Sequence, residues 1–171
     1  GIRNLLNYTE QFDNGYWSKT NTTITANATE APDGTQTADK LVQNSSTGFH
    51  YINRAYAVSD YTLITNSIHA KAGGYNYLYI FGNNHTTGSS SGTVVNLTNG
   101  TIVTNGHDAV VESKGNGWYR VSTKHYKTSS LTLNTYVTQT SSPASEAGDG
   151  SSGIYLWGAQ LEEATEASNY Q

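Results

Sequence analysis

Hydrophobic and polar residues alternate along one stretch of this chain, AKAGGYNYLYIFGNN, at residues 70–84. Tyr75, Tyr77 and Tyr79 occupy every second position, and Leu78 and Ile80 follow the last two of them. Because the side chains of a strand point alternately to its two faces, the aliphatic residues share one face and the tyrosines share the other. The pattern predicts a strand with Leu78 and Ile80 in the core and Tyr77 and Tyr79 pointing away from it.

Short β-rich runs of this kind recur between turn signals. Asn-Gly and Asp-Gly dipeptides, which tolerate the positive φ of tight turns, punctuate the chain from end to end. No window shows a sustained helical period, and the only helix-like piece is LEEATEAS (161–168). Many short strands with almost no helix predict an all-β fold, a two-sheet antiparallel sandwich or a barrel. The predicted strands are 20–26, 36–43, 49–58, 61–71, 75–82, 93–97, 108–113, 117–127, 130–138 and 153–162.

The chain of 171 residues is long enough for one domain with a sizeable core. The low-complexity segment 138–153 is predicted to be a long surface loop between two strands, and no linker or internal repeat divides the sequence. We therefore predict that residues 1–171 form a single domain. Because the sequence begins at Gly1 and contains no methionine, we expect it to be part of a longer polypeptide.

Composition excludes several classes of partner. Only 13% of the residues are charged and the net charge is −4, so no basic stripe exists to neutralise the phosphates of a nucleic acid. The absence of cysteine excludes disulfides and thiolate metal sites. No apolar run approaches the ~20 residues of a membrane span, so membrane insertion is not expected. The 13 tyrosines, set among Ser, Thr, Asn and Gly, suit an adaptable hydrogen-bonding surface.

Five short motifs follow one another along the chain: NLLNYTEQFDNGYWSKT (4–20), ADKL (38–41), HAKAGGYNYLYI (69–80), GNGWYRVS (115–122) and SGIYLWGAQLEE (152–163). In this order they resemble the jelly-roll carbohydrate-binding modules of the family 4/9/22-like superfamily. The resemblance extends from Asn4 to Glu163, and it is closest to the versions found in phage tail and tail-fibre proteins and in polysaccharide-degrading enzymes.

The resemblance implies a two-sheet jelly roll with adjacent first and last strands. Ligands of that family bind along the concave face or at the loops on its rim, without chemistry. It also implies that the partner is a polysaccharide or cell-surface glycan and that the location is extracellular or in a virion tail. A parent polypeptide of that kind can be trimeric.

Many members of that family carry a structural calcium ion near the paired termini. Asp13 would fill the role of the acidic residue after the first strand, with Glu10 nearby. The last strand reads YLWGAQLEE, so Trp157, Gly158 and Gln160 stand where the family has a pair of aspartates. In this sequence Gln160 and backbone carbonyls would have to supply oxygen ligands instead.

The tyrosine row is the main candidate for ligand binding. Planar rings can stack on the C–H patches of sugar rings while phenol hydroxyls pair with sugar hydroxyls. Tyrosines are, however, also good strand residues on a solvated face. The predicted ligand-binding residues are Tyr75, Tyr77, Tyr79, Arg54, His69 and Lys71.

Three of these candidates come from neighbouring strands. In ITNSIHAKA (64–72), His69 and Lys71 lie on the face opposite the aliphatic residues, and His69 could equally be an ordinary surface residue. Arg54 lies between Ile52 and Tyr56 on one face, where a charge must be paired with a carboxylate or directed at a ligand. The three tryptophans are expected to be packing residues: Trp17, Trp118 and Trp157.

No catalytic constellation is visible. Glycoside hydrolysis needs two facing carboxylates, but the 13 acidic residues lie mostly in turns and in the tail. The five histidines have no metal-like spacing, and no serine stands in a nucleophile elbow. We predict a non-catalytic carbohydrate-binding domain, appended to a phage tail protein or a secreted glycan-active enzyme. The alternatives are a structural or assembly domain of a tail fibre without sugar binding and, third, a lyase or hydrolase on the same fold.

Overall fold

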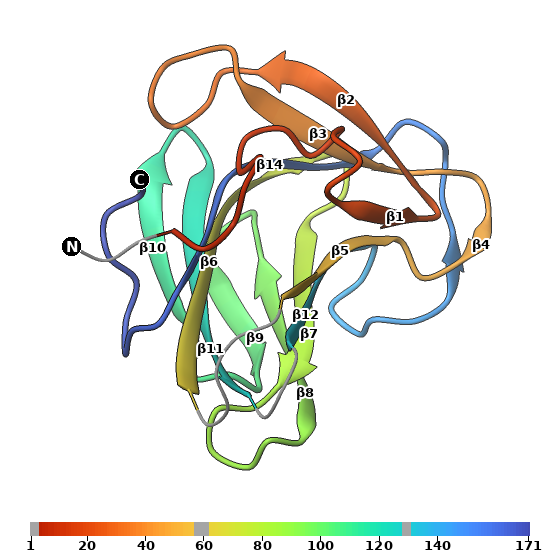
Figure 1. Cartoon of the computed structure of the whole chain (residues 1–171). Coiled ribbons are helices and arrows are strands. Elements are labelled where there is room, and N and C mark those ends of the chain that lie inside the picture. The colour runs from red at the N-terminus through yellow and green to blue at the C-terminus, as the bar shows by residue number, and fades with distance from the viewer. Residues whose placement is uncertain (1–3, 57–61, 128–130) are drawn as a thin grey trace.

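The computed structural model describes residues 4–56, 62–127 and 131–171, and these residues form two antiparallel six-stranded sheets that face each other (Figure 1). The predicted all-β sandwich is confirmed. The described residues contain no helix, and hence none long and apolar enough to cross a membrane. Sheet A contains, in spatial order, β1 (Ser18–Thr20), β5 (Tyr51–Tyr56), β12 (Leu131–Thr138), β7 (Tyr77–Asn83), β8 (Ser90–Asn96) and β9 (Thr101–Asn105).

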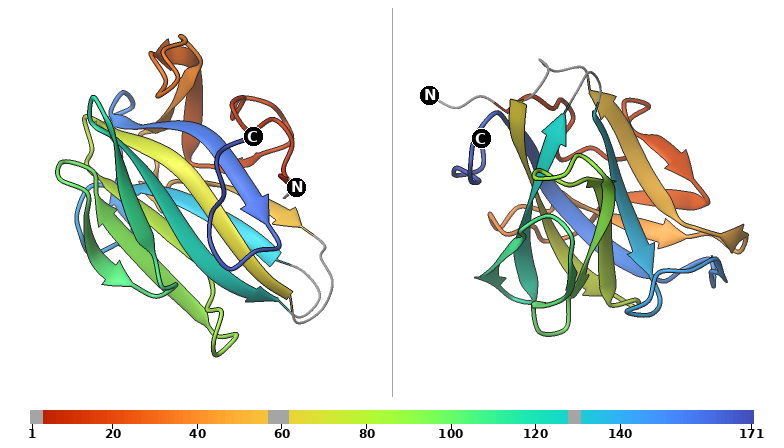
Figure 2. Two further views of the ribbon diagram at one scale, coloured as in Figure 1. Left: turned by 90° about the vertical axis from the view of Figure 1, so that its left-hand side faces the viewer. Right: turned by 90° about the horizontal axis from the view of Figure 1, so that it is seen from below.

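Sheet B faces the viewer in the left view of Figure 2, where β6 (Thr62–Gly73) lies between β11 (Trp118–Lys127) and β14 (Gly153–Glu162). A small third ladder pairs β4 (Thr47–Gly48) with β13 (Glu146–Ala147). The strands of sheet B, in spatial order, are β10 (Val110–Gly115), β11 (Trp118–Lys127), β6 (Thr62–Gly73), β14 (Gly153–Glu162), β3 (Ala38–Gln43) and β2 (Thr22–Thr29).

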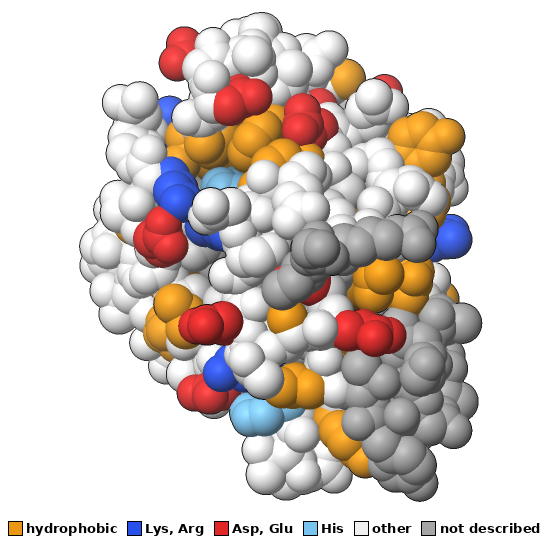
Figure 3. All heavy atoms as spheres, turned by 60° about the vertical axis from the view of Figure 1, so that its left-hand side comes forward, with side chains coloured by type: hydrophobic (Ala, Val, Ile, Leu, Met, Phe, Trp, Pro, Cys, Tyr) orange, Lys and Arg blue, Asp and Glu red, His pale blue; other side chains and the backbone are white. Residues whose placement is uncertain are grey.

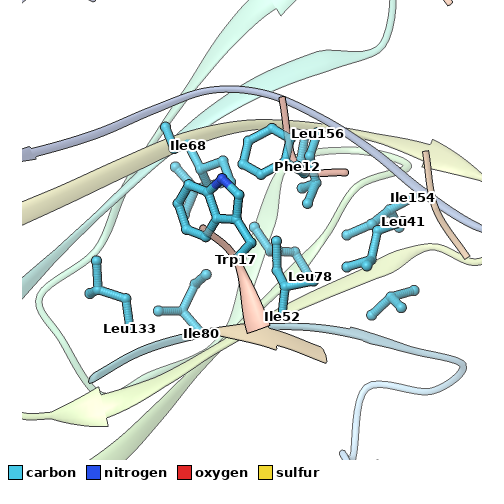
Figure 4. Packing of buried hydrophobic residues seen from close by; sticks show 14 of the residues in the cluster. Phe12, Trp17, Leu41, Ile52, Ile68, Leu78, Ile80, Leu133, Ile154 and Leu156 are labelled. Carbon is cyan, nitrogen blue, oxygen red and sulfur yellow. The ribbon is translucent and has the colours of Figure 1, made fainter. Parts of the chain in front are cut away.

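The main hydrophobic core lies between the two sheets. In β7, Leu78 and Ile80 are almost completely buried, as their alternation with the tyrosines predicted. Phe12 and Trp17, from the segment before β1, lie between side chains of the two sheets with ring centroids 5.1 Å apart (Figure 4). The N-terminal segment thus closes the core, and burial of this apolar surface is the main force that holds the sheets together.

A second, smaller hydrophobic cluster lies on the outer face of sheet B. It consists of Trp118, Trp157, Ala31 and Ala38, with Tyr155 and Tyr170 packed against it. The loop between β2 and β3 and the C-terminal residues contribute to this cluster. The three tryptophans are therefore packing residues as predicted, but only Trp17 belongs to the core between the sheets.

Several local predictions were wrong. Four strands were missed: β1, β9 and the two-residue strands β4 and β13, the last of which lies in the predicted long loop 138–153. The helix-like piece 161–168 begins as the end of β14 and continues as bends, because its buried Glu162 holds the following segment by hydrogen bonds. The first and last strands lie in different sheets. The segment that precedes β1 lies beside β14 instead: the backbone N–H of Leu5 donates a hydrogen bond of 2.8 Å to the carbonyl of Leu161.

Candidate functional site

Three tyrosines form a continuous row across the outer face of sheet A. Tyr51 on β5, Tyr136 on β12 and Tyr79 on β7 stand directly opposite one another in the strand register. Their ring centroids are 4.5 Å apart between Tyr51 and Tyr136 and 4.9 Å apart between Tyr136 and Tyr79. We call these three residues the tyrosine row. It runs across the strands rather than along one of them.

Two phenylalanines extend the row. Phe49, which is 41% exposed, lies 5.9 Å from Tyr136, and Phe81 lies 6.0 Å from Tyr79, both measured between ring centroids. Polar side chains lie beside the row on the same face, two residues away along each strand. Asn53 on β5 is opposite Asn134 on β12, and the two side-chain amides are hydrogen-bonded at 3.3 Å. The face therefore combines aromatic surface with amide groups beside it.

The ring of Tyr79 leans over the neighbouring strand β8 because residue 92 is a glycine. A Cβ atom at Gly92 would lie only 2.5 Å from Cε1 of Tyr79, so a side chain there would push the ring away. Gly92 stands opposite Phe81, two pairs along from the pair of Tyr79 and Val94 and on the same face of the sheet. This glycine thus leaves room for the ring of Tyr79 to lie low on the sheet.

Two phenols of the row, those of Tyr136 and Tyr79, are held in the neutral form. Burial, with the neighbouring Tyr51 and Tyr79 as further causes, raises the pKa of Tyr136 to about 12. Burial likewise raises the pKa of Tyr79. A neutral phenol both donates and accepts hydrogen bonds, which is what pairing with hydroxyl groups requires.

One end of the row opens into a hollow of about 250 Å³ between β7, β8 and β12. Phe81 forms part of its wall, and Asn83, Ser90, Thr132 and Asn134 contribute polar groups. The side-chain oxygen of Asn83 is buried and has no hydrogen-bond partner among the residues that the structure describes. The hollow therefore places polar side chains next to aromatic surface, and its lining contains no Asp or Glu.

The structure divides the six predicted ligand-binding residues among several places. Tyr77 and Tyr79 lie on the outer face of sheet A, as predicted. Tyr75 does not join them: it precedes β7, packs partly against the core, and its hydroxyl accepts a hydrogen bond of 3.2 Å from the backbone of Asp149. Burial, together with Asp149, raises the pKa of Tyr75. Period-two spacing placed Tyr75 on the wrong side because the strand begins only at Tyr77.

Arg54 lies on the inner face of β5, opposite Leu133, and so cannot reach the tyrosine row. Its guanidinium stacks on the ring of Tyr16, 4.0 Å from the ring centroid, and donates to the Tyr16 carbonyl at 3.4 Å. The prediction of an inward-facing charge is confirmed, but an aromatic ring takes the place of the expected carboxylate. No ion pair of Arg54 is found within residues 4–56, 62–127 and 131–171.

His69 and Lys71 lie on the opposite sheet. His69 is 3% exposed and lies beneath Trp157 and Tyr170, with ring centroids at 5.1 and 6.0 Å. Burial and the charge of Arg120 lower the pKa of His69 to about 4, so it is a neutral packing residue rather than a ligand contact. Lys71 is on the outer face of sheet B, half-buried. The expectation of one shared site is corrected, because β6 and β7 belong to different sheets.

Four aromatic residues of this face were not among the predicted ligand-binding residues: Tyr51, Tyr136, Phe49 and Phe81. For Tyr136, the alternation of β12 does predict an outward-facing side chain, since Leu133 and Val137 are buried on the other face. What the sequence could not supply was the order β5-β12-β7, in which strands far apart in the chain become neighbours. A row across strands cannot be recognised from any one of them.

The residues proposed to bind calcium do not converge. Glu10 accepts a hydrogen bond from the Tyr170 hydroxyl at 2.8 Å, and Gln160 is fully engaged by Glu162 and the backbone of Gln171. Glu10 and Asp13 border a hollow of about 270 Å³ together with the buried Asp39. Within the described part of the chain, no group of three or more Asp, Glu or His residues is placed to hold a metal ion. Calcium stays a prediction from the resemblance.

Comparison with known proteins identifies the fold. No protein-family model and no curated protein sequence matches the chain. Among solved structures, the enzymatically active domain of bacteriophage CBA120 tailspike protein 4 superimposes with a TM-score of 0.50 and 15% identity, over 92% of this chain and 21% of the tailspike chain. TmCBM61, solved in complex with β-1,4-galactotriose, gives a TM-score of 0.50 and 9% identity over 95% of this chain and 99% of its own.

A CBM22-containing module pair of Clostridium thermocellum xylanase 10B matches more distantly, with a TM-score of 0.46 and 14% identity over 98% of this chain and 28% of that one. The chain thus spans about a fifth of the tailspike chain and almost all of the carbohydrate-binding module. It has the fold of the jelly-roll carbohydrate-binding modules, as the sequence motifs indicated.

Proposed function

We propose that this chain is a carbohydrate-binding domain that holds a glycan on the outer face of sheet A and leaves it chemically unchanged. The observation that carries the proposal is the tyrosine row, in which Tyr51, Tyr136 and Tyr79 follow one another at 4.5 and 4.9 Å across three strands. The fold supports it, since TmCBM61 has the same fold and was solved with an oligosaccharide. The glycan would lie along the row, across the direction of the strands.

Recognition would combine stacking with hydrogen bonds. The sugar faces expose C–H groups that pack on tyrosine rings, and the ring hydroxyls of the sugar reach the neutral phenols. The side chains of Asn134, Thr132 and Ser90 line the hollow at one end of the row, where they can orient a sugar unit. An open face of this kind gains little free energy after the sugar hydroxyls lose water, so each site would bind weakly.

Weak single sites are effective when several are linked. We propose, accordingly, that the domain belongs to a longer extracellular or virion-tail polypeptide, either a phage tail protein that could be trimeric or a secreted glycan-active enzyme. Similarity to a domain of a bacteriophage tailspike supports the first of these. The competing proposal is a structural domain of a tail fibre, in which the exposed rings form a protein interface, since tyrosine is enriched at such interfaces too.

A glycan array with matched variants tests the proposal. In the double variant Tyr79→Ala/Tyr136→Ala we expect binding to the best glycan to weaken by roughly tenfold or more, because two stacking surfaces are lost. Tyr8→Ala removes an exposed tyrosine, 48% accessible, outside the row and should leave binding unchanged. Equal binding by the wild type and the double variant would contradict the proposal. Binding of no glycan, together with a stable oligomer, would favour the structural alternative.

A further inference from the structure

A second aromatic surface lies on sheet B, on the side of the molecule away from the tyrosine row. Lys40 on β3 and Lys71 on β6 both stand opposite Tyr155 on β14 in the strand register, so the tyrosine lies between two lysines. Neighbouring strands are about 4.8 Å apart, so the two lysine Cα atoms are about 10 Å apart. Trp118 on β11 and Lys71 line one cavity together. We call Lys40, Tyr155, Lys71 and Trp118 the lysine–aromatic row.

The side chains of this row lie low on the sheet because glycines make room for them. A Cβ atom at Gly73 would lie 3.0 Å from the ring of Tyr155 and 3.3 Å from the stem of Lys40. A Cβ atom at Gly117 would lie 3.3 Å from the stem of Lys71. The Lys40 ammonium lies 5.6 Å from the centroid of the Tyr155 ring. The row is therefore a platform, with an aromatic ring flanked by two cations.

The ammonium groups of Lys40 and Lys71 make no ion pair within the parts of the chain that the structure describes, where the two ion pairs are those of Lys114 with Glu112 and of Lys124 with Asp108. The Lys71 ammonium is therefore available for a ligand, and the Lys40 ammonium stands over the Tyr155 ring without a carboxylate partner. A cavity of about 380 Å³ adjoins the row, lined by Lys71 and Trp118 together with Thr29, Glu30, Ala31 and Asn116. The cavity lies between the loop that joins β2 to β3 and the turn before β11.

Figure 3 views this side of the molecule. In its upper part, hydrophobic side chains line a hollow beneath a projecting lobe, with Lys or Arg side chains on one flank and Asp or Glu side chains on the other. The cavity lining itself combines the indole of Trp118, the cation of Lys71, the carboxylate of Glu30 and the polar side chains of Thr29 and Asn116.

From these contacts we infer that the lysine–aromatic row and its cavity form a second saccharide site, selective for sugars that carry an anionic group. The ring of Tyr155 would pack against a sugar face, and the ammonium groups of Lys40 and Lys71 would pair with a carboxylate or sulfate on the sugar. Glu30 at the cavity wall would repel the same anion and thereby limit affinity. This site is independent of the tyrosine row, because the two rows are on different sheets.

The experiment is affinity electrophoresis in gels that contain polygalacturonate, chondroitin sulfate or a neutral galactan. We expect the wild type to be retarded by an anionic polysaccharide, and the retardation to fall as salt is raised. Lys40→Gln/Lys71→Gln should weaken that binding by about tenfold. Glu30→Gln should strengthen the binding, because it removes the carboxylate that repels the anion. The local structure should be kept, since the Glu30 carbonyl that accepts a hydrogen bond from the Trp118 indole belongs to the backbone. Polygalacturonate carries carboxylates alone and chondroitin sulfate carries carboxylates and sulfates, so binding of chondroitin sulfate without binding of polygalacturonate would indicate sulfate recognition.

Two controls separate this site from other causes. Lys124→Gln removes one lysine charge at the far end of β11, where the lysine is already paired with Asp108, and should bind as the wild type does. Tyr79→Ala/Tyr136→Ala should lose the neutral glycan of the first site and keep the anionic one. The inference is overturned if no anionic polysaccharide retards the protein, if Lys124→Gln weakens binding as much as the double lysine variant, or if the tyrosine double variant loses the anionic ligand.

Discussion

Gly92 decides how one ring of the tyrosine row is presented. Its Cα lies beneath the edge of Tyr79, and a methyl group there would be 2.5 Å from Cε1 and 3.0 Å from the hydroxyl of that ring. The backbone at Gly92 does not need the left-handed conformation, so alanine can be accommodated once the ring moves. The glycine therefore serves the shape of the face rather than the path of the chain.

We predict that Gly92→Ala weakens glycan binding several-fold while the protein stays folded, because the displaced ring of Tyr79 no longer continues the row. Isothermal titration against the best array glycan measures the affinity, and thermal unfolding measures the fold. Gly15→Ala is the matched control, since a Cβ atom there would meet nothing within 4 Å. An unchanged affinity in Gly92→Ala would mean that the tilt of Tyr79 does not matter for binding.

For single residues, the sequence predicted which face of a strand a side chain occupies better than it predicted which residues that side chain contacts. Leu78, Ile80, Tyr77 and Tyr79 point where alternation placed them. Arg54 also faces inward as predicted, yet its partner is the ring of Tyr16, from a segment that alternation says nothing about. Contacts between residues far apart in sequence depend on the packing of the whole sandwich.

At the scale of elements, the last residues of the chain cover sheet B as an ordered segment. The buried carboxylate of Glu162 accepts hydrogen bonds from the backbone and hydroxyl of Ser168 at 2.9 and 2.6 Å. Tyr170 then packs against Trp157, with ring centroids 4.8 Å apart, and over His69. Local sequence favoured a helix here, but three hydrogen bonds to one buried carboxylate hold the segment in another course.

The covering by Tyr170 should be visible in the titration of His69. Tyr170→Ala opens the cover, so we predict that the pKa of His69 rises from about 4 toward its ordinary value, because burial is the main cause of its depression. The same variant should lower stability by about 1–3 kcal/mol through lost packing. NMR titration of the imidazole measures the first effect, with Tyr8→Ala as the control. A pKa of His69 that does not change would show that Tyr170 is not its cover.

The order of the strands within the sheets is what made the site invisible to sequence reasoning. Each of the ten predicted strands overlaps a strand of the structure, although residues 57, 58, 61 and 130 of the predicted ranges lie outside the described residues. The four strands that were missed are short or, like β9, exposed along most of their length. Alternation and turn residues specify a strand locally, but the pairing of β5 with β12 joins residues about eighty positions apart. Both rows, on sheet A and on sheet B, are made by such pairings.

At the scale of the whole molecule, a buried histidine pair connects the two sheets. His107 and His125 are completely buried, with ring centroids 4.5 Å apart. His107 faces the carbonyl of Gly82 in sheet A at 3.0 Å, and His125, on β11 of sheet B, faces the carbonyl of Asn83 at 3.0 Å. The other ring nitrogen of each lies next to a threonine hydroxyl. Each imidazole is thus satisfied in its neutral form, donating to the carbonyl and accepting from the hydroxyl.

Because of this pair, we predict that the free energy of unfolding decreases in mild acid. Burial lowers the pKa of His125 to about 3, with His107 as a further cause, and burial also lowers that of His107. In the unfolded chain both imidazoles have pKa values near 6.5, so between pH 6.5 and 3 the unfolded state binds more protons and stability falls as the pH falls. For His125 alone this amounts to about 3 kcal/mol between pH 6.5 and 4. The raised pKa of Asp39 acts in the opposite direction over part of this range.

Urea unfolding at pH 7.0, 5.5 and 4.0 measures the effect. We expect the free energy of unfolding of the wild type to decrease steadily over this series, and that of His107→Gln/His125→Gln to start lower and decrease less steeply, because two titrating groups are gone while His69, whose pKa is also lowered by burial, remains. His85→Gln, which changes a partly exposed histidine nearby, should retain the slope of the wild type. If the double variant loses stability with falling pH as steeply as the wild type, the acid sensitivity of the sandwich has its origin elsewhere, with His69 the next group to test because its pKa is also lowered by burial.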